Sequence, residues 1–221
     1  MKLLVEALTK FTCGLLLVGL LIFLPAGTLQ YTYGWYLIAL LFAPMLAVGF
    51  LMLFKAPDFL KKRLDAKEKQ TVQKGVVAFS GVMFVAGFAV AGLDFRFGWS
   101  NMPPWVIITA SVLFLVAYAL YAEVMRENAY LSRTIKVEEG QTVVDTGLYG
   151  IVRHPMYAVT ILLFLMIPLI LGSWYAFVAF AFYPAIIVVR LKDEEDLLTK
   201  ELSGYTEYKQ KVKYRLLPFI W

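Results

Sequence analysis

Six apolar runs divide the chain, near residues 11–29, 33–54, 76–93, 104–125, 156–171 and 174–189. Each of the first four has about the 20 residues that a helix needs to cross a hydrocarbon core roughly 30 Å thick. The last two correspond to only about 24 Å of helix each, and Gly172-Ser173 separates them. The pattern therefore predicts an all-α, polytopic membrane helix bundle of about six membrane segments, which includes a short C-terminal helical hairpin.

Composition agrees with a membrane protein. Of the 221 residues, 61% are hydrophobic and 17% are charged, whereas a soluble domain carries about 25% charged residues. The first apolar run is long for a secretory signal and further runs follow it, which predicts a retained first helix. Cys13 is the only cysteine and His154 the only histidine, so no intrachain disulfide is possible and we expect no metal site.

The basic residues lie almost entirely on alternate sides of the apolar runs. The net charge is +5 and the pI is about 9.2, but all of the 21 Lys and Arg residues except Arg96 precede the first run or follow the second, fourth or sixth. Such alternation is the positive-inside signal, and it predicts an integral membrane protein with both termini in the cytoplasm. The basic charge then indicates membrane lipids as partners, and no nucleic acid.

The two parts of the chain differ in polarity. Residues 1–125 hold the first four runs and few polar groups, so we expect a four-helix transmembrane scaffold there. Residues 126–221 hold nearly all the candidate chemistry: a polar stretch, the predicted hairpin and a charged helix that ends near Ser203-Gly204. We expect this second part to be the catalytic and cofactor-binding region.

The sequence Arg153-His154-Pro155-Met156-Tyr157 stands where the polar stretch meets the fifth run. Proline suits the first turn of a helix, and a helix N-terminus favours an anionic ligand group. The arginine and histidine add donors, and the tyrosine adds a phenol and an aromatic face. Interfacial anchoring is the alternative for each residue taken singly, but the five together favour a ligand site.

Arg190 and Glu194 lie four residues apart, so they share one face of the last long helix. A surface ion pair is one interpretation, and the neighbouring acidic residues are typical of a solvated face. Arg190 also ends the sixth apolar run, which predicts a position at the membrane boundary. An arginine there is able to bind a carboxylate or phosphate whose lipid tail remains in the bilayer.

Taken in order, "GLYGIVRHPMY" at 147–157, the hairpin, Arg190 with the Glu194-Glu195 pair, and "GYTEYKQKV" at 204–212 carry a resemblance. This set resembles the isoprenylcysteine carboxyl methyltransferase family, whose wider group includes phospholipid N-methyltransferases. The resemblance covers roughly residues 126–221. It implies membrane helices with a cytoplasmic pocket for S-adenosylmethionine, and a methyl acceptor that is lipophilic, such as the carboxylate of a prenylcysteine-like substrate.

Matched position by position, the resemblance also implies site residues. Arg190 corresponds to the substrate-side arginine, and Glu194 to an acidic residue with roles in catalysis and cofactor binding. Tyrosine faces and a carboxylate would favour the cationic sulfonium of the cofactor. The implied cofactor-binding residues are Gln141, Thr142, Val143, Val144, Tyr149, His154, Pro155, Met156, Tyr157, Glu194 and Glu195.

Two alternatives remain open. The ending "KVKYRLLPFIW" and the Arg-His-Pro motif also resemble membrane sterol and steroid reductases, which bind NADPH and transfer a hydride. Their motif commonly has asparagine where this chain has Met156, and the Glu194-Glu195 pair and the short chain favour methyl transfer. The second alternative is a non-catalytic lipid-binding protein with the same fold.

Overall fold

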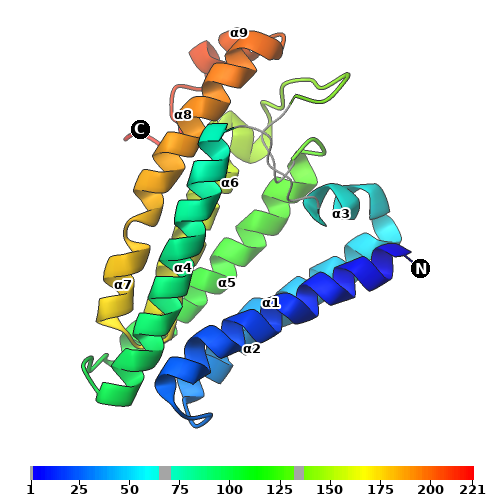
Figure 1. The fold of residues 1–221 in the computed structure, drawn as a ribbon. Coiled ribbons are helices and arrows are strands. Elements are labelled where there is room, and N and C mark those ends of the chain that lie inside the picture. The colour runs from blue at the N-terminus through cyan, green and yellow to red at the C-terminus, as the bar shows by residue number, and fades with distance from the viewer. Residues whose placement is uncertain (1, 65–70, 132–136) are drawn as a thin grey trace.

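A computed structural model describes residues 2–64, 71–131 and 137–221, and all regular structure in these ranges is helical (Figure 1). The helices, one of them a 3₁₀ helix (η1), are α1 (Lys2–Ala26), α2 (Thr32–Lys55), α3 (Pro57–Leu64), α4 (Thr71–Phe97), α5 (Pro104–Glu127), η1 (Gly147–Gly150), α6 (Pro155–Ile170), α7 (Trp174–Phe180), α8 (Tyr183–Glu201) and α9 (Tyr205–Lys211).

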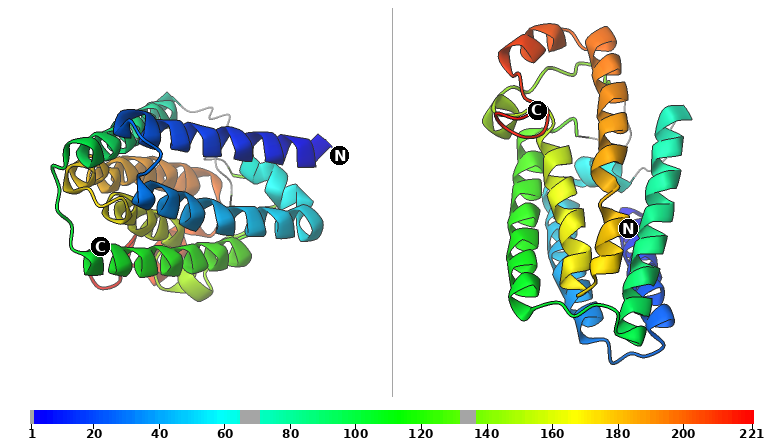
Figure 2. Two further views of the ribbon diagram at one scale, coloured as in Figure 1. Left: turned by 90° about the horizontal axis from the view of Figure 1, so that it is seen from below. Right: turned by 90° about the vertical axis from the view of Figure 1, so that its left-hand side faces the viewer.

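Five helical segments of the described chain are long and apolar enough to cross a membrane: α1, α2, α4, α5 and the α7–α8 pair, with α6 as a shorter apolar helix. The predicted all-α membrane bundle is therefore confirmed. Successive long helices alternate in direction, so the α1–α2, α4–α5 and α6–α7 connections lie at one end (Figures 1 and 2). The opposite end carries α3, η1, α9 and most basic residues; which side of the membrane it faces stays a prediction.

The predicted hairpin forms from α6 and the α7–α8 pair, but its second arm differs from the prediction. The helix of this arm breaks after Phe180 and restarts at Tyr183, and α8 then continues without interruption through Arg190 to Glu201. Pro184 explains the break, because proline has no N–H and its ring clashes with the carbonyl four residues earlier, at Phe180. The apolar part of the arm and the charged helix are therefore one element, which carries the candidate side chains from the membrane into the polar end.

The first helix also begins earlier than predicted. It starts at Lys2 instead of residue 11, because Leu3, Leu4, Val5, Ala7 and Leu8 extend the apolar surface. Glu6 and Lys10 interrupt this apolar surface, but they lie one helical turn apart and form an ion pair, with 2.6 Å between the carboxylate and the ammonium.

Helix α4 is the centre of the packing and contacts α1, α7 and α8, while α5 packs along α6. Two of its glycines permit close approach. A Cβ at Gly92 would clash with the carbonyl oxygen of Ile22 in α1, and a Cβ at Gly87 would clash with the ring of Phe180 in α7. Dispersion contacts between closely packed backbones stabilise helix pairs in lipid, where the hydrophobic effect between helices is weak.

The end of the bundle opposite the basic residues is joined by one buried carboxylate. Asp94 of α4 accepts hydrogen bonds from the backbone N–H and hydroxyl of Ser100, at 2.7 and 2.6 Å, and from the hydroxyl of Ser173. Tyr31 donates to the carbonyl oxygen of Leu171 at 2.5 Å. These bonds connect the α4–α5 loop and the α1–α2 loop to the α6–α7 turn, which fixes the height of α6 and of the motif at its start.

Candidate active site

A pocket opens at the basic end of the bundle, between the end of α5, the segment 137–146, η1, the start of α6, α8 and α9. The pocket is open to solvent, and its volume is about 890 Å³ when the open mouth is included. The described residues that line it are Asn128, Tyr130, Leu131, Gln141, Thr142, Val143, Val144, Tyr149, Arg153, His154, Met156, Tyr157, Arg190, Glu194, Leu198, Leu202, Tyr205 and Tyr208.

Most of the predicted site residues meet in this pocket. Arg190, Glu194, His154 and Tyr157 line it together with the predicted residues Gln141, Thr142, Val143, Val144, Tyr149 and Met156. Pro155 and Glu195 do not reach its surface. Two parts of the lining were not predicted: the end of α5, which no sequence motif marks, and Leu198, which helical spacing from Arg190 and Glu194 indicates. Tyr205 and Tyr208 of α9 also line the pocket.

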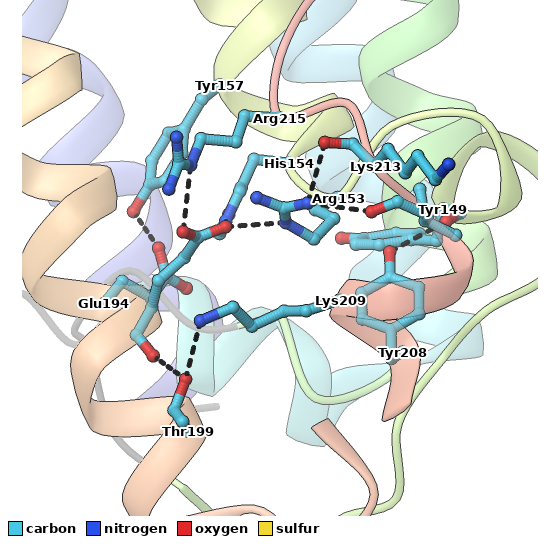
Figure 3. A network of polar contacts seen from close by, with 12 residues as sticks. Tyr149, Arg153, His154, Tyr157, Glu194, Thr199, Tyr208, Lys209, Lys213 and Arg215 are labelled. Atoms are coloured by element: carbon cyan, nitrogen blue, oxygen red, sulfur yellow. Dashed lines mark hydrogen bonds and ion pairs between the residues drawn. The ribbon is translucent and has the colours of Figure 1, made fainter. Parts of the chain in front are cut away.

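Glu195 lies behind the pocket wall and holds the motif in place. Its side chain is 4% exposed and receives three cationic or ring donors: Arg153 Nε at 2.7 Å, Arg215 Nε at 2.9 Å and His154 Nε2 at 3.2 Å. Figure 3 shows the side chains of Arg153, His154 and Arg215 converging there. Arg153 also donates through Nη1 to the carbonyl oxygens of Val212 and Lys213, at 2.8 and 2.9 Å.

Main-chain bonds reinforce this connection. The N–H groups of Arg153 and His154 donate to the carbonyl oxygens of Tyr214 and Arg215, both at 2.9 Å. The stretch that follows α9 thus pairs with the residues that precede α6. The Arg-His-Pro motif is consequently fixed to α8 by ion pairs and to the C-terminal segment by backbone hydrogen bonds.

One end of the pocket is charged. Tyr157 donates its hydroxyl hydrogen to the Glu194 carboxylate (Figure 3). The same hydroxyl accepts a hydrogen bond from Arg190 Nε at 3.0 Å. The imidazole of His154 stacks on the Tyr157 ring, with 5.6 Å between the ring centroids and 22° between the planes. A cation, an anion and an aromatic face therefore lie side by side, an arrangement suited to a small ligand that carries both charges.

The other end is aromatic and apolar. The rings of Tyr205 and Tyr208 pack with Leu202 and Val143, and Tyr208 donates its hydroxyl hydrogen to the carbonyl oxygen of Tyr149 at 2.7 Å. Burial is the main cause that raises the pKa of Tyr149, Tyr205 and Tyr208 above the usual value of a phenol. All three side chains are consequently neutral donors near pH 7 and present flat apolar faces.

The turn that carries Tyr149 is held by Glu127 at the end of α5. Both carboxylate oxygens of Glu127 accept from the N–H of Leu148, at 2.9 and 3.1 Å. Gly147 makes this possible, since its φ is +52° and a Cβ there would clash with the Glu127 carboxylate. Local sequence pattern does not predict this contact, because the two residues lie 21 positions apart.

We expect Gly147→Ala to lower the free energy of unfolding by roughly 2–4 kcal/mol, from left-handed strain and loss of the Glu127 contact. Gly140→Ala is the matched control, because Gly140 also has a positive φ, +71°, but no atom lies within 4 Å of its Cβ position. The control should lose only about 1 kcal/mol. Thermal or denaturant unfolding in detergent measures both, and equal losses would show that Glu127 does not restrict the turn.

Comparison with known proteins adds a family to this geometry. Residues 105–200 match the model of the isoprenylcysteine carboxyl methyltransferase (ICMT) family. A 95-residue segment, 42% of this chain, is 32% identical to the uncharacterized protein YpbQ of Bacillus subtilis and spans 56% of that protein.

Sterol reductases are also similar to part of the chain. Over 136 residues, 55% of this chain, it is 24% identical to the Delta(14)-sterol reductase of Methylotuvimicrobium alcaliphilum, of which it covers 32%. Over 91 residues, 40% of this chain, it is 29% identical to the Delta(14)-sterol reductase TM7SF2 of Mus musculus, of which it covers 22%. The chain thus covers only part of the length of each of these curated relatives: 56% of YpbQ and 32% and 22% of the two reductases.

The family match runs from α5 to the end of α8 and includes the Arg-His-Pro motif, Arg190 and Glu194. These elements form the charged end of the pocket and all of its described lining except Leu202, Tyr205 and Tyr208. The part of the chain that carries the motif, Arg190 and Glu194 thus matches the isoprenylcysteine carboxyl methyltransferase family.

Proposed function

We propose that this protein transfers a methyl group from S-adenosylmethionine to a lipophilic acceptor at the membrane surface, most simply to the carboxylate of a prenylcysteine-like molecule. The observation that carries the proposal is the Arg190–Tyr157–Glu194 chain at one end of a pocket whose other end is aromatic. Such a pocket offers separate environments to the charged and apolar parts of one cofactor. Its arginine also lies where α8 leaves its apolar run.

The residue types fit S-adenosylmethionine. When bound, this cofactor supplies an electrophilic methyl group on a cationic sulfonium. The carboxylate of Glu194 and the face of Tyr157 would stabilise that positive charge, while His154 and the N-terminus of α6 would favour the carboxylate of its amino-acid part. The tyrosine faces at the other end would pack against its base. Each side chain lines the same pocket.

Arg190 is the residue best suited to orient the acceptor. It directly follows the apolar stretch Ile186–Val189 of α8, so an acceptor carboxylate bound to it keeps its tail in the apolar part of the bundle. A carboxylate is already deprotonated near neutral pH and needs no general base. Holding the acceptor in near-attack geometry is then the principal contribution of the protein to the rate.

A second candidate is an NADPH-dependent reductase that acts on a sterol-like molecule. It is favoured by the similarity to two Delta(14)-sterol reductases, which extends over 136 residues in one case. The same pocket would then hold a nicotinamide dinucleotide. The family match and the Glu194 carboxylate in the charged end favour the methyltransferase, since a carboxylate suits a sulfonium better than a phosphate.

Thermal unfolding of the detergent-purified protein, with S-adenosylhomocysteine and separately with NADPH, distinguishes the two. A ligand at 100 times its Kd adds about 2.7 kcal/mol to the stability of the native state. We expect stabilisation by S-adenosylhomocysteine alone. Stabilisation by NADPH alone would show that the reductase is the correct candidate. No effect of either ligand would favour a non-catalytic lipid-binding protein.

Within this proposal, Tyr157→Phe and His154→Ala should each weaken S-adenosylhomocysteine binding. Tyr157→Phe removes the hydroxyl that connects Arg190 to Glu194, and we expect its Kd to rise about 3- to 10-fold. His154→Ala removes a donor and the ring that stacks on Tyr157. Calorimetry measures both Kd values. Unchanged affinity in both variants would show that the motif does not bind the cofactor.

A further inference from the structure

Tyr205, the first residue of α9, has a hydroxyl that no residue of the described chain satisfies. Its side chain lines the pocket and is 4% exposed, and its hydroxyl oxygen is buried without a hydrogen-bond partner among the described residues. By contrast, the hydroxyl of Tyr157 is bonded to Glu194, and that of Tyr208 to the carbonyl of Tyr149. Tyr205 is thus the exception among these three tyrosines.

A buried hydroxyl without a partner destabilises the folded protein by about 1–3 kcal/mol, and phenylalanine would fill the same space without that penalty. Buried polar groups of this kind usually have a partner that is absent from the protein itself. The location of Tyr205 in the pocket wall indicates that the partner is a ligand.

The surroundings of Tyr205 show which part of the pocket its hydroxyl serves. The ring packs in the aromatic end, against Leu202 and Tyr208. Burial, and then the charges of Glu195 and Glu194, raise the pKa of the phenol, so it remains a hydrogen-bond donor. We take this position, packed in the aromatic end and influenced by the charge of Glu194 in the charged end, as the junction between the two ends.

We propose that the Tyr205 hydroxyl donates a hydrogen bond to the bound cofactor at this junction, as a further binding residue of the site. The inference rests on the proposed function. A cofactor with its base in the aromatic end and its sulfonium in the charged end has its sugar between them. A sugar oxygen is thus the acceptor that the junction favours.

Tyr208 provides a matched control, because it lies one turn away on the same helix and its hydroxyl is already satisfied by Tyr149. Tyr205→Phe removes an unpartnered hydroxyl, so the ligand-free protein should be as stable as the original or more stable. Tyr208→Phe leaves a buried carbonyl without its donor and should lower the unfolding temperature of the ligand-free protein.

The test measures unfolding temperature without ligand and the Kd for S-adenosylhomocysteine in the full-length protein and both variants. We expect Tyr205→Phe to raise the Kd about 3- to 10-fold while the unfolding temperature stays constant or rises. An unchanged Kd would overturn the proposal, because a water molecule or nothing would then satisfy the hydroxyl. A weaker Kd accompanied by a lower unfolding temperature would also overturn it, since the tyrosine would then be a structural residue.

The same data separate this inference from the proposed function. If the original protein does not bind S-adenosylhomocysteine, the proposed function fails. If the original protein binds it and Tyr205→Phe binds it equally well, only the role of Tyr205 fails.

Discussion

Arg190→Ala should reduce methyl transfer about 100-fold or more while the Kd for S-adenosylhomocysteine changes no more than a few fold. The guanidinium lies in the charged end of the pocket, directly after the apolar stretch of α8, and donates to Tyr157 at 3.0 Å, so it is placed to hold an acceptor carboxylate. Charge-assisted hydrogen bonds contribute about 1.5–3 kcal/mol each, and about 1.4 kcal/mol corresponds to a tenfold change in rate. Steady-state kinetics with a prenylcysteine-like acceptor, together with calorimetry, measures both quantities.

Two further variants make this result interpretable. Lys192→Ala removes an exposed positive charge two residues away on α8 and should leave both quantities nearly unchanged. Arg190→Lys keeps the charge but loses the planar fork, so it should recover only part of the activity. If Arg190→Ala weakens cofactor binding as much as turnover, the arginine acts through Tyr157 and Glu194 on the cofactor, and its assignment to the acceptor is wrong.

The fold could be predicted from the sequence to the extent that it depends on local apolar content. A run of about 20 apolar residues has to satisfy its backbone hydrogen bonds internally in lipid, which makes a helix nearly obligatory. The break between Phe180 and Tyr183 was missed although Pro184 signals it, because the apolar content does not change there. The early start of α1 was missed for a similar reason: the Glu6–Lys10 pair interrupts the apolar pattern without ending the helix.

The candidate site was predictable where residue type and helical spacing are informative. Arg190, Glu194 and Leu198 lie four residues apart in turn, and all three line the pocket. Glu195 could not be assigned in the same way, because successive helical residues point about 100° apart. Glu195 therefore turns into the protein, as does Leu191, which is fully buried four residues earlier.

The partners of Glu195 were beyond sequence reasoning. Arg153 and Arg215 lie 42 and 20 residues away along the chain, and they meet the carboxylate only because the segment after α9 returns to pair with the residues before α6. Local pattern cannot predict which cation completes such a long-range pair. Two adjacent glutamates with similar sequence surroundings thus acquire different roles, Glu194 facing the pocket and Glu195 holding the motif.

Glu195→Ala should accordingly have the largest effect on stability, lowering the free energy of unfolding by about 3–5 kcal/mol. Arg153 and His154 are 7% and 6% exposed, so removing the carboxylate leaves a buried guanidinium without its counter-charge, and breaking a buried pair has this cost. For a protein of this size the unfolding temperature should fall by roughly 10 °C. Thermal unfolding in detergent measures the change.

Asp196→Ala is the control, since Asp196 is the next residue of α8 and is exposed; a surface substitution of this kind should change the stability by no more than about 0.5 kcal/mol. Glu195→Gln should fall between the two, because the amide keeps the shape and one acceptor oxygen but not the charge. S-adenosylhomocysteine should restore only part of the stability that Glu195→Ala loses, because the motif released by this substitution includes His154 of the pocket wall. If instead Glu195→Ala unfolds at the same temperature as Asp196→Ala, the three donors are satisfied elsewhere and the carboxylate does not hold the motif.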